Sequence, residues 1–294
     1  MRKRILKFFH RHQNMKAFGI LSPCIFWLGF FFLMPLVIMA IYSFLQRGLY
    51  GGVEWMFTWE HYPRFIDPIY LKILVRTFRL SFMATIALLI IGYPMAYKIA
   101  RAQKRWRNVL LFLVILPFWT SDLIRTYAWM LILRDTGLIN NLLMFLHIID
   151  EPLTLLYTEG AILLGLIYVY LPFMVLPLYA SIEKLDPSLL EAAEDLGATP
   201  FWGFLKVTVP LTKSGILAGS LLVFIPSVGV YVVSDLLGGA KAMMIGNLVK
   251  LQFGQARNWP FGSAASFILM TVVLFAVFAY LKFAGGKEAL EEAR

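Results

Sequence analysis

The sequence contains a single cysteine, Cys24, and only four histidines. One cysteine excludes an internal disulfide and a cluster of thiolate ligands around a metal. The sequence also lacks the phosphate-binding pattern Gly-x-x-x-x-Gly-Lys-Ser/Thr, the zinc-binding pattern His-Glu-x-x-His and the nucleophile pattern Gly-x-Ser-x-Gly. We therefore expect this chain not to be an enzyme and to hold no cofactor of its own. If it moves a solute uphill, the energy comes from a partner or from an ion gradient.

Charged residues are scarce, at 15% of the chain, while hydrophobic residues make up 60% and the mean hydropathy is +0.74. This composition excludes an ordinary soluble domain. Apolar runs of about 20 residues predict membrane-spanning helices. The sequence thus predicts an all-α polytopic membrane protein with six spans, at about 19–45, 77–97, 109–132, 161–181, 214–234 and 263–283.

The basic residues that give the net charge of +10 gather on particular loops. Seventeen Lys and Arg residues fall on the segments predicted to be inside and seven on those predicted to be outside. This asymmetry places both termini in the cytoplasm. It explains the charge by the membrane surface, without nucleic acid. The predicted organisation is a basic cytoplasmic N-terminus (1–18), a six-span domain (19–283) and a cytoplasmic tail (284–294).

One polar interior segment stands out between two apolar runs. Asp186 and Pro187 are typical of a helix start, and Ser188 and Glu191 have the spacing of a capping box. Gly197 stands where a helix C-cap glycine with positive φ is expected, which predicts that valine is not tolerated there. These signals predict a short amphipathic helix with a flat face of small residues.

The same segment resembles the EAA loop of the permeases of ABC importers. Glu-Ala-Ala, three residues, Gly, nine residues and an aliphatic-x-aliphatic-Pro ending are matched here by Glu191, Ala192, Ala193, Gly197 and Pro210. The resemblance implies a type I ABC-importer permease whose loop, at about 182–213, is a coupling helix that docks on a cytoplasmic ATPase. It implies ATPase contacts at Glu191, Ala192, Ala193, Asp195 and Gly197. The alternative is an ordinary interfacial helix between two spans.

Charged and aromatic side chains near the spans are candidates for a transport path, since charges within spans are costly. A straight third span places Asp122 about 20 Å from its inner end, at 1.5 Å per residue, and Asp235 closes the fifth span. Carboxylates and aromatic faces suit an organic cation. The predicted path residues are Asp122, Trp119, Tyr127, Tyr231 and Asp235, with Tyr168 and Tyr170 at comparable depth. Alternatively, Asp122 pairs with Arg125 at i+3, and the aromatics pack between helices or form an interfacial belt.

Further segments are similar to the polyamine-uptake branch of these permeases, closest to the PotB-type subunit of bacterial spermidine/putrescine importers. They are Leu116–Thr120, Leu123–Arg125, Leu171–Tyr179, Ser181–Asp186 and Ser234–Lys241. The resemblance implies four kinds of partner in the bacterial inner membrane and beside it. They are a second, PotC-type permease, two PotA-type ATPase subunits that bind ATP and Mg²⁺, a PotD-type periplasmic binding protein, and the lipid bilayer.

Three other interpretations remain open from the sequence. The substrate is another small cation, such as putrescine alone, an amino-acid-derived cation or ferric ion. From a different class, the chain is a transporter driven by protons or sodium, which should show paired half-repeats and more buried ionisable groups. A scaffold protein of the membrane is the third, and it would not need a polar helix with EAA spacing.

Overall fold

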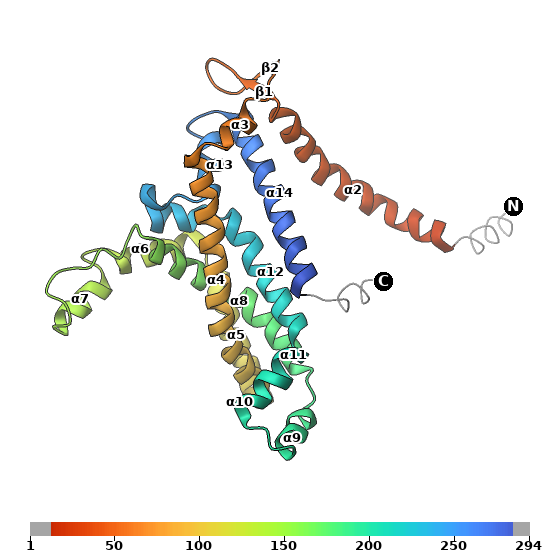
Figure 1. Ribbon diagram of the computed structural model, residues 1–294, viewed down its shortest axis with the longest axis vertical. Coiled ribbons are helices and arrows are strands. Elements are labelled where there is room, and N and C mark those ends of the chain that lie inside the picture. The colour runs from red at the N-terminus through yellow and green to blue at the C-terminus, as the bar shows by residue number, and fades with distance from the viewer. Residues whose placement is uncertain (1–12, 285–294) are drawn as a thin grey trace. The chain divides into compact units, whose positions relative to one another are not determined.

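The computed structural model describes residues 13–284 (Figure 1). Most of the basic N-terminal segment and the tail at 285–294 lie outside the described residues, so their cytoplasmic placement and the three-part organisation stay predictions. The described residues form two compact units. One contains residues up to 64 together with 252–267, and the other contains 65–251 together with the chain from 268 onward.

The first unit joins a long apolar helix to an aromatic hairpin. Helix α2 (Gln13–Tyr42) leads into strands β1 (Leu45–Arg47) and β2 (Val53–Phe57), which pair antiparallel, and then into α3 (His61–Phe65). This aromatic-rich segment therefore has regular structure. Phe44 packs against the rings of Phe57, Trp59 and Tyr62. Such contacts are needed because an isolated two-stranded hairpin is barely stable in water.

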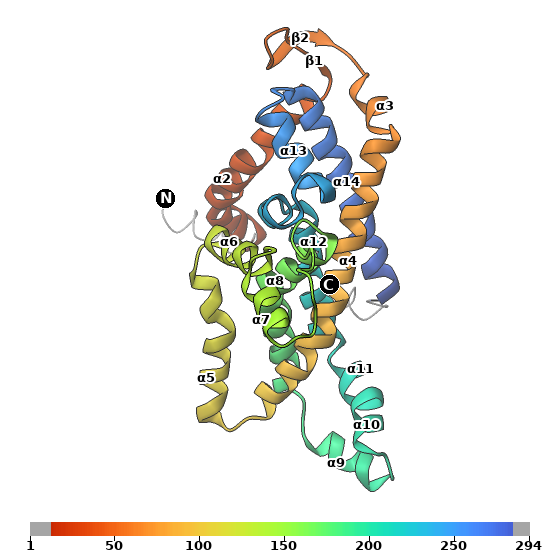
Figure 2. The same cartoon turned by 90° about the vertical axis from the view of Figure 1, so that its left-hand side faces the viewer.

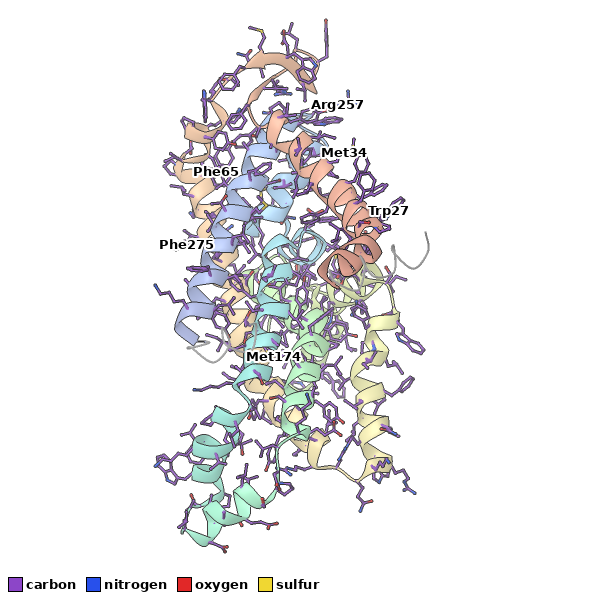
Figure 3. All side chains as sticks on the ribbon, turned by 90° about the vertical axis from the view of Figure 1, so that its right-hand side faces the viewer. Trp27, Met34, Phe65, Met174, Arg257 and Phe275 are labelled. Atoms are coloured by element: carbon purple, nitrogen blue, oxygen red, sulfur yellow. The ribbon has the colours of Figure 1, made fainter. Side chains whose placement is uncertain are left out.

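The second unit is a bundle built around α4 (Pro68–Arg101), α8 (Glu159–Glu183) and α12 (Lys213–Gly229), which pack on one another (Figure 2). Its core includes Leu88 of α4 and Leu166 and Met174 of α8, all fully buried. Figure 3 shows Met174 in the interior, whereas Phe275 of α14 (Trp259–Ala284) points away from the bundle. At 1.5 Å per residue, the 25 residues of α8 extend about 37 Å, enough to cross a bilayer core.

Small residues bring α12 and α8 together. A Cβ at Gly215 would lie 2.5 Å from the Ser181 Cβ and 2.8 Å from the Pro177 carbonyl oxygen. A Cβ at Gly219 would lie 2.9 Å from the Met174 sulfur. Glycine at these positions allows the two helices to approach closely. Pro172 and Pro177 do not break α8, which is helical from Glu159 to Glu183.

The third predicted span is not a straight helix, and that prediction is wrong. The chain forms α5 (Lys104–Ile115), the 3₁₀ turn η1 (Leu116–Trp119), α6 (Asp122–Leu133) and α7 (Leu138–Phe145). The axis bends by 90° between Lys104–Trp119 and Asp122–Phe145. Thr120 and Ser121 are extended at the bend, and Pro117 starts the preceding 3₁₀ turn. The depth expected for Asp122 on a straight helix is therefore also wrong.

A second bend, of 70°, lies between Pro200–Leu211 and α12. The first of these stretches consists of α10 (Pro200–Gly203), the π-helix η2 (Phe204–Thr208) and α11 (Val209–Leu211). Among the described residues, four helices are long and apolar enough to cross a membrane, or up to six if each bent pair is one span. The six predicted spans correspond to the larger count.

The fifth predicted span also ends earlier than expected. Helix α12 stops at Gly229, and Val230 is extended. The chain then forms the π-helix η3 (Ser234–Gly238), the 3₁₀ turn η4 (Gly239–Ala242) and α13 (Ile245–Phe253). Asp235 therefore lies on a separate turn beyond the span. Helices α9 (Ser188–Asp195) and α13 lie at opposite ends of α4 (Figures 1 and 2).

Candidate functional site

Both ends of helix α9 are set by local side-chain and backbone chemistry. The Asp186 carboxylate accepts a hydrogen bond from the Ser188 amide at 3.0 Å. This bond and one from the Ser188 hydroxyl hold the pKa of the Asp186 carboxyl below its usual range. At the other end Gly197 has φ +84°, and its amide donates to the Glu194 carbonyl at 2.8 Å. The predicted start and the predicted glycine cap are confirmed.

The detailed cap differs from the predicted one. The sequence suggests a capping box in which Ser188 and Glu191 bond each other's backbone. Instead, Asp186 makes the cap, and the Ser188 hydroxyl is engaged by the Asp186 carboxylate. The reason is position: Asp186 stands two residues before Ser188, where its carboxylate reaches the first free amides of the helix.

Helix α9 buries none of its residues. Leu189 is exposed on it, and Leu196, just after its end, is 89% exposed. Within residues 13–284, no ion pair engages the carboxylates of Glu191, Glu194 or Asp195. An exposed apolar side chain beside unpaired acidic groups is a surface that a partner protein can cover.

The α9 segment is joined to the bundle through buried contacts near its base. The Tyr93 hydroxyl of α4 lies 2.7 Å from the Thr212 hydroxyl, which itself donates to the Thr208 carbonyl at 2.7 Å. The Tyr93 ring packs edge-on against Phe204 of η2, with ring centroids 5.1 Å apart. A displacement of η2 therefore reaches α4 through a hydrogen bond and a ring contact.

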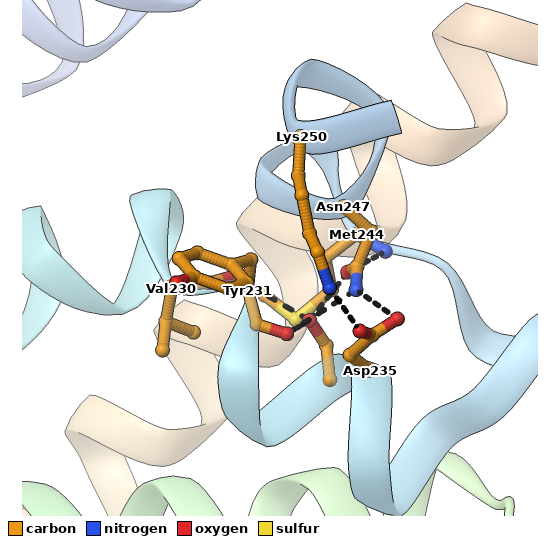
Figure 4. A network of polar contacts seen from close by, with 7 residues as sticks. Val230, Tyr231, Asp235, Met244, Asn247 and Lys250 are labelled. Atoms are coloured by element: carbon orange, nitrogen blue, oxygen red, sulfur yellow. Dashed lines mark hydrogen bonds and ion pairs between the residues drawn. The ribbon is translucent and has the colours of Figure 1, made fainter. Parts of the chain in front are cut away.

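At the opposite end of the bundle, two of the predicted path residues meet in one polar network (Figure 4). The Lys250 ammonium donates to the Asp235 carboxylate at 2.5 Å and lies 5.2 Å from the centre of the Tyr231 ring. The hydrogen bond to Asp235 is the largest cause that raises the pKa of Lys250. The other carboxylate oxygen of Asp235 accepts from the Asn247 amide at 3.3 Å.

Asn247 holds this network in place. Its side chain is 6% exposed, and its amide nitrogen also donates to the Tyr231 carbonyl at 3.2 Å. Its amide oxygen accepts from the Ser234 hydroxyl and from the Met244 backbone amide. The Asn247 side chain thus makes all of its hydrogen bonds to η3, to Tyr231 just before η3 and to Met244 just before α13.

A cavity of about 600 Å³ lies beside the network and is lined in part by Asp235, Asn247 and Tyr157. Tyr157 has φ +60°, and its amide donates to the Leu237 carbonyl at 2.8 Å. Gly239, on the same wall, also has positive φ, and its missing Cβ would lie 2.7 Å from the Tyr157 ring. A positive φ at a residue other than glycine, such as Tyr157, costs free energy and persists only where the surrounding structure fixes it. Such residues are common at functional sites.

The other predicted path residues lie around the bend before α6. Asp122 stands in the first turn of α6, and its carboxylate lies 3.8 Å from the Arg125 guanidinium, the alternative partner that the sequence suggested. Trp119 is exposed and packs edge-on against Phe112. Tyr127 is exposed on α6. Helix α6 packs against η3, so Asp122 and Tyr127 lie on an element next to that of Asp235.

The two tyrosines of α8 that were considered for the path are placed in helix packing. Tyr168 packs edge-on against Trp129 of α6, with centroids 5.6 Å apart. Tyr170 is buried and lies against Phe173. The structure therefore brings together Tyr231 and Asp235. It leaves Trp119 and Tyr127 exposed on η1 and α6, and Tyr168 and Tyr170 make contacts between side chains.

Sequence reasoning missed Lys250 and Asn247. Both lie on the amphipathic stretch that became α13, three residues apart, which places them on one helix face. That spacing was the available signal. The sequence alone does not show that this face turns toward Asp235, because the turns η3 and η4 set that direction.

A separate groove of about 330 Å³ lies between α4, α12 and α14, lined mainly by apolar side chains such as Phe82, Ile216 and Val277. Its polar groups are hydroxyls, including those of Thr85 and Ser220. Because the groove has no charged side chain, it does not match a cationic ligand.

Three comparisons place the chain among known proteins. Residues 88–284 match the family model described as binding-protein-dependent transport system inner membrane component. The chain is 46% identical over 248 residues to the spermidine/putrescine transport system permease protein PotB of Escherichia coli K12, covering 84% of this chain and 90% of the relative. It is 44% identical over 256 residues to PotB of Haemophilus influenzae, covering 87% and 90%.

More distant similarities agree in fold. The chain is 33% identical to the inner membrane ABC transporter permease protein YdcU of Escherichia coli K12, covering 96% of this chain and 94% of that protein. A solved bacterial ABC transporter that imports the polysaccharide alginate matches with a TM-score of 0.72 at 20% identity, covering 96% of this chain and 98% of that one. At that identity the match concerns the fold.

Proposed function

The chain belongs to the family of binding-protein-dependent transport system inner membrane components, and we propose that it is the PotB-type permease subunit of an importer of spermidine, putrescine or both. The observation that carries this proposal is the 46% identity over 248 residues to a spermidine/putrescine permease. As a member of its family the chain is an inner-membrane component of an ABC importer that works with a binding protein.

The proposal also includes the other subunits of the complex. A second, PotC-type permease would complete the translocation path, and a PotD-type protein would deliver the polyamine from the periplasm. Two PotA-type ATPase subunits would bind ATP and Mg²⁺, while this chain would hold neither and would not be an enzyme. Both termini would lie in the cytoplasm, and α9 would face the ATPase.

The geometry of α9 supports its role as the coupling helix. It projects from the bundle with no buried residue, and its carboxylates are unpaired among the described residues. Closure of the ATPase dimer on ATP would move α9 and, through Phe204 and Thr212, the base of α4. The spans would then change from inward-facing to outward-facing, and the cation would pass from the binding protein into the path.

The network around Asp235 supports a cationic substrate. A carboxylate beside an aromatic face binds alkylammonium groups by ion pairing and cation–π attraction. Asp235 and Lys250 are about half exposed, at 48% and 52% of their side chains. Solvent access keeps such contacts weak, and weak contacts allow a transported ion to leave.

The test is ATP hydrolysis by the complete complex in lipid nanodiscs, with the binding protein added empty, loaded with spermidine, and loaded with putrescine. We expect stimulation by at least one loaded form and its loss when Glu191 and Gly197 are both replaced. Replacement of Glu60, an exposed glutamate of the first unit, serves as the matched control.

Two results would contradict the proposal in different ways. A complex that assembles but responds to neither polyamine would remove the substrate assignment and leave the importer permease. Full stimulation in the Glu191 and Gly197 variants would remove α9 as the coupling helix.

A further inference from the structure

We propose that Tyr231, Asp235 and Asn247 form a binding site for a primary alkylammonium group, and that Lys250 is a tethered occupant which a substrate ammonium must displace. The proposal deepens the proposed function, on which it rests for the identity of the natural ligand. The site itself is argued from contacts within this chain and can be tested with a simple amine.

The Lys250 side chain makes the contacts that a free alkylammonium would make. Its Nζ lies 2.5 Å from Oδ2 of Asp235 and 5.2 Å from the centre of the Tyr231 ring. A lysine side chain beyond its Cα is a butylammonium in all but its attachment: a chain of four methylene groups that ends in one –NH₃⁺ with three donors. A polyamine presents the same primary ammonium at its ends. Figure 4 shows Lys250 reaching from α13 toward Asp235, with the Tyr231 ring beside it.

The site persists without Lys250 because Asp235 has a second anchor. The buried Asn247 amide donates to Oδ1 of Asp235 at 3.3 Å and to the Tyr231 carbonyl at 3.2 Å. Asn247 therefore positions the carboxylate and the Tyr231 backbone together. When the Lys250 side chain swings away, a carboxylate oxygen and an aromatic face remain in place to accept another ammonium.

Displacement of Lys250 is easy for two reasons. The Asp235–Lys250 pair is about half exposed, and exposed ion pairs change an equilibrium by about fivefold or less. In addition, the lysine stem is flexible and its head is readily hydrated by water. The Asp235–Lys250 ion pair is therefore weak and partly exposed, and it is not a buried structural ion pair.

An incoming cation has a route to Asp235 that does not pass through Lys250. The cavity of about 600 Å³ is lined by Asp235 and Asn247 but not by Lys250, which approaches the carboxylate from α13. A ligand in the cavity reaches Asp235 first and then competes for the position of the lysine Nζ. The tyrosine ring of Tyr157 lines the same cavity and offers a second aromatic face for the rest of the ligand.

A tethered competitor suits a transporter that must release its cargo. Lys250 is always present at high local concentration, so it returns to Asp235 as soon as the substrate ammonium moves away. It lowers the affinity of the site without removing its selectivity for cations. We expect removal of Lys250 to strengthen ammonium binding, which is the opposite of what the loss of a binding residue does.

The experiment measures binding of radiolabelled n-butylammonium to the complete complex in nanodiscs by equilibrium dialysis. Lys250→Met should bind the amine up to about fivefold more tightly than the unaltered complex, because the exposed ion pair that competes for Asp235 has been removed. The double variant Lys250→Met with Asp235→Asn should lose that gain. Lys72→Met is the matched control, since it removes an exposed lysine of α4 that does not line the cavity and leaves the Asp235–Lys250 pair intact.

A second measurement uses the unaltered complex and does not depend on the folding of a variant. n-Butylguanidinium does not react with acylating reagents, so Lys250 can be acetylated by the N-hydroxysuccinimide ester of acetate in its presence. We expect Lys250 to be acetylated several times faster as the guanidinium displaces it, while Lys72, which does not line the cavity, is unaffected. A gain in Lys72→Met as large as that in Lys250→Met, or an unchanged acetylation rate of Lys250, would overturn the proposal.

These results are separable from those for the proposed function. Butylammonium binding that strengthens in Lys250→Met, in a complex whose ATPase ignores both polyamines, would keep the ammonium site and reject the polyamine substrate. Polyamine-stimulated hydrolysis with no effect of Lys250→Met on amine binding would keep the importer and reject this site.

Discussion

The charged groups at the two ends of the bundle differ in whether they have partners within the chain. Around α9, acidic side chains and a leucine are exposed, and within the described residues no cation pairs with the carboxylates. Around Asp235, both carboxylate oxygens already have partners, and a buried asparagine has used its full hydrogen-bonding capacity. The α9 end therefore exposes carboxylates that have no cationic partner among the described residues. The Asp235 end pairs its charged groups with other groups of the same chain.

This difference indicates how each end works. The α9 end can contribute little to the stability of the bundle, because it buries no residue, so its substitution should affect partners more than folding. The Asp235 end is part of the packed structure, so its substitution should affect both. A buried tyrosine links α4 to the base of the α9 segment.

The largest effect is expected from Asn247→Leu at the Asp235 end. This change leaves the Met244 amide without its acceptor and removes one acceptor of the Ser234 hydroxyl, and a buried polar group left unpaired costs about 1–3 kcal/mol. We expect a loss of about 2–4 kcal/mol in the free energy of unfolding, measured by thermal unfolding in nanodiscs. Asn141→Leu, on an exposed face of α7, should change it by no more than about 0.5 kcal/mol. Equal losses of unfolding free energy in both variants would contradict a structural role for the hydrogen bonds of Asn247.

The next effect separates coupling from stability at the α9 end. Gly197→Val forces a β-branched residue to φ +84°, which costs about 1–2 kcal/mol in the local cap. Polyamine-stimulated ATP hydrolysis should fall about tenfold, while the unfolding temperature of the bundle stays unchanged. Gly197→Asn should retain most activity, since asparagine tolerates this conformation. Full stimulation of ATP hydrolysis in the Gly197→Val complex would show that coupling does not require a positive φ at residue 197.

A smaller effect tests the link between the ends. Tyr93→Phe removes the hydroxyl that lies 2.7 Å from Thr212, while the ring remains packed on Phe204. The net loss of such a bond is about 1 kcal/mol, read as a lower unfolding temperature together with weaker stimulation of hydrolysis. Tyr97→Phe, one turn further along α4, should leave both readings unchanged. Identical behaviour of the two variants would remove Tyr93 from the connection.

The smallest effect concerns the cap of α9 and its dependence on pH. The pKa of Asp186 lies below its ordinary value, so its capping contribution is complete above about pH 4. It is lost as the pH falls through the lowered pKa. After correction for intrinsic exchange rates, hydrogen–deuterium exchange of the Ser188 amide should be constant from neutral pH down to about pH 5 and rise only below about pH 4. Asp186→Ala should show the faster exchange at every pH, and a pH-dependent rate in that variant would point to another group.

Much of the α9 region could be predicted from the sequence because its determinants are local. Asp186 caps amides two residues away, and Gly197 adopts a conformation that few other residues accept. The EAA spacing lies within a single segment and needs no tertiary contact to be recognised. The apolar lengths of α2, α4 and α8 also follow from composition.

The Asp235 region could be predicted only in part. Tyr231 and Asp235 lie four residues apart and were proposed together, yet their partners Lys250 and Asn247 come from a different element. The bend before α6 was missed because Pro117 permits either a kinked helix or a break. The choice depends on the extended backbone of Thr120 and Ser121, which no side-chain pattern in the segment required.

The sequence by itself determined the apolar helices, the caps of α9 and the chemistry available at each end, because hydropathy and capping act within a few residues. The tertiary structure alone decided that Asp235 meets Lys250, that Asn247 is buried behind them and that Asp122 lies beyond a 90° bend. These arrangements depend on the turns that orient one element relative to another. The orientation of each turn is selected by many packing contacts between residues that are far apart in the sequence.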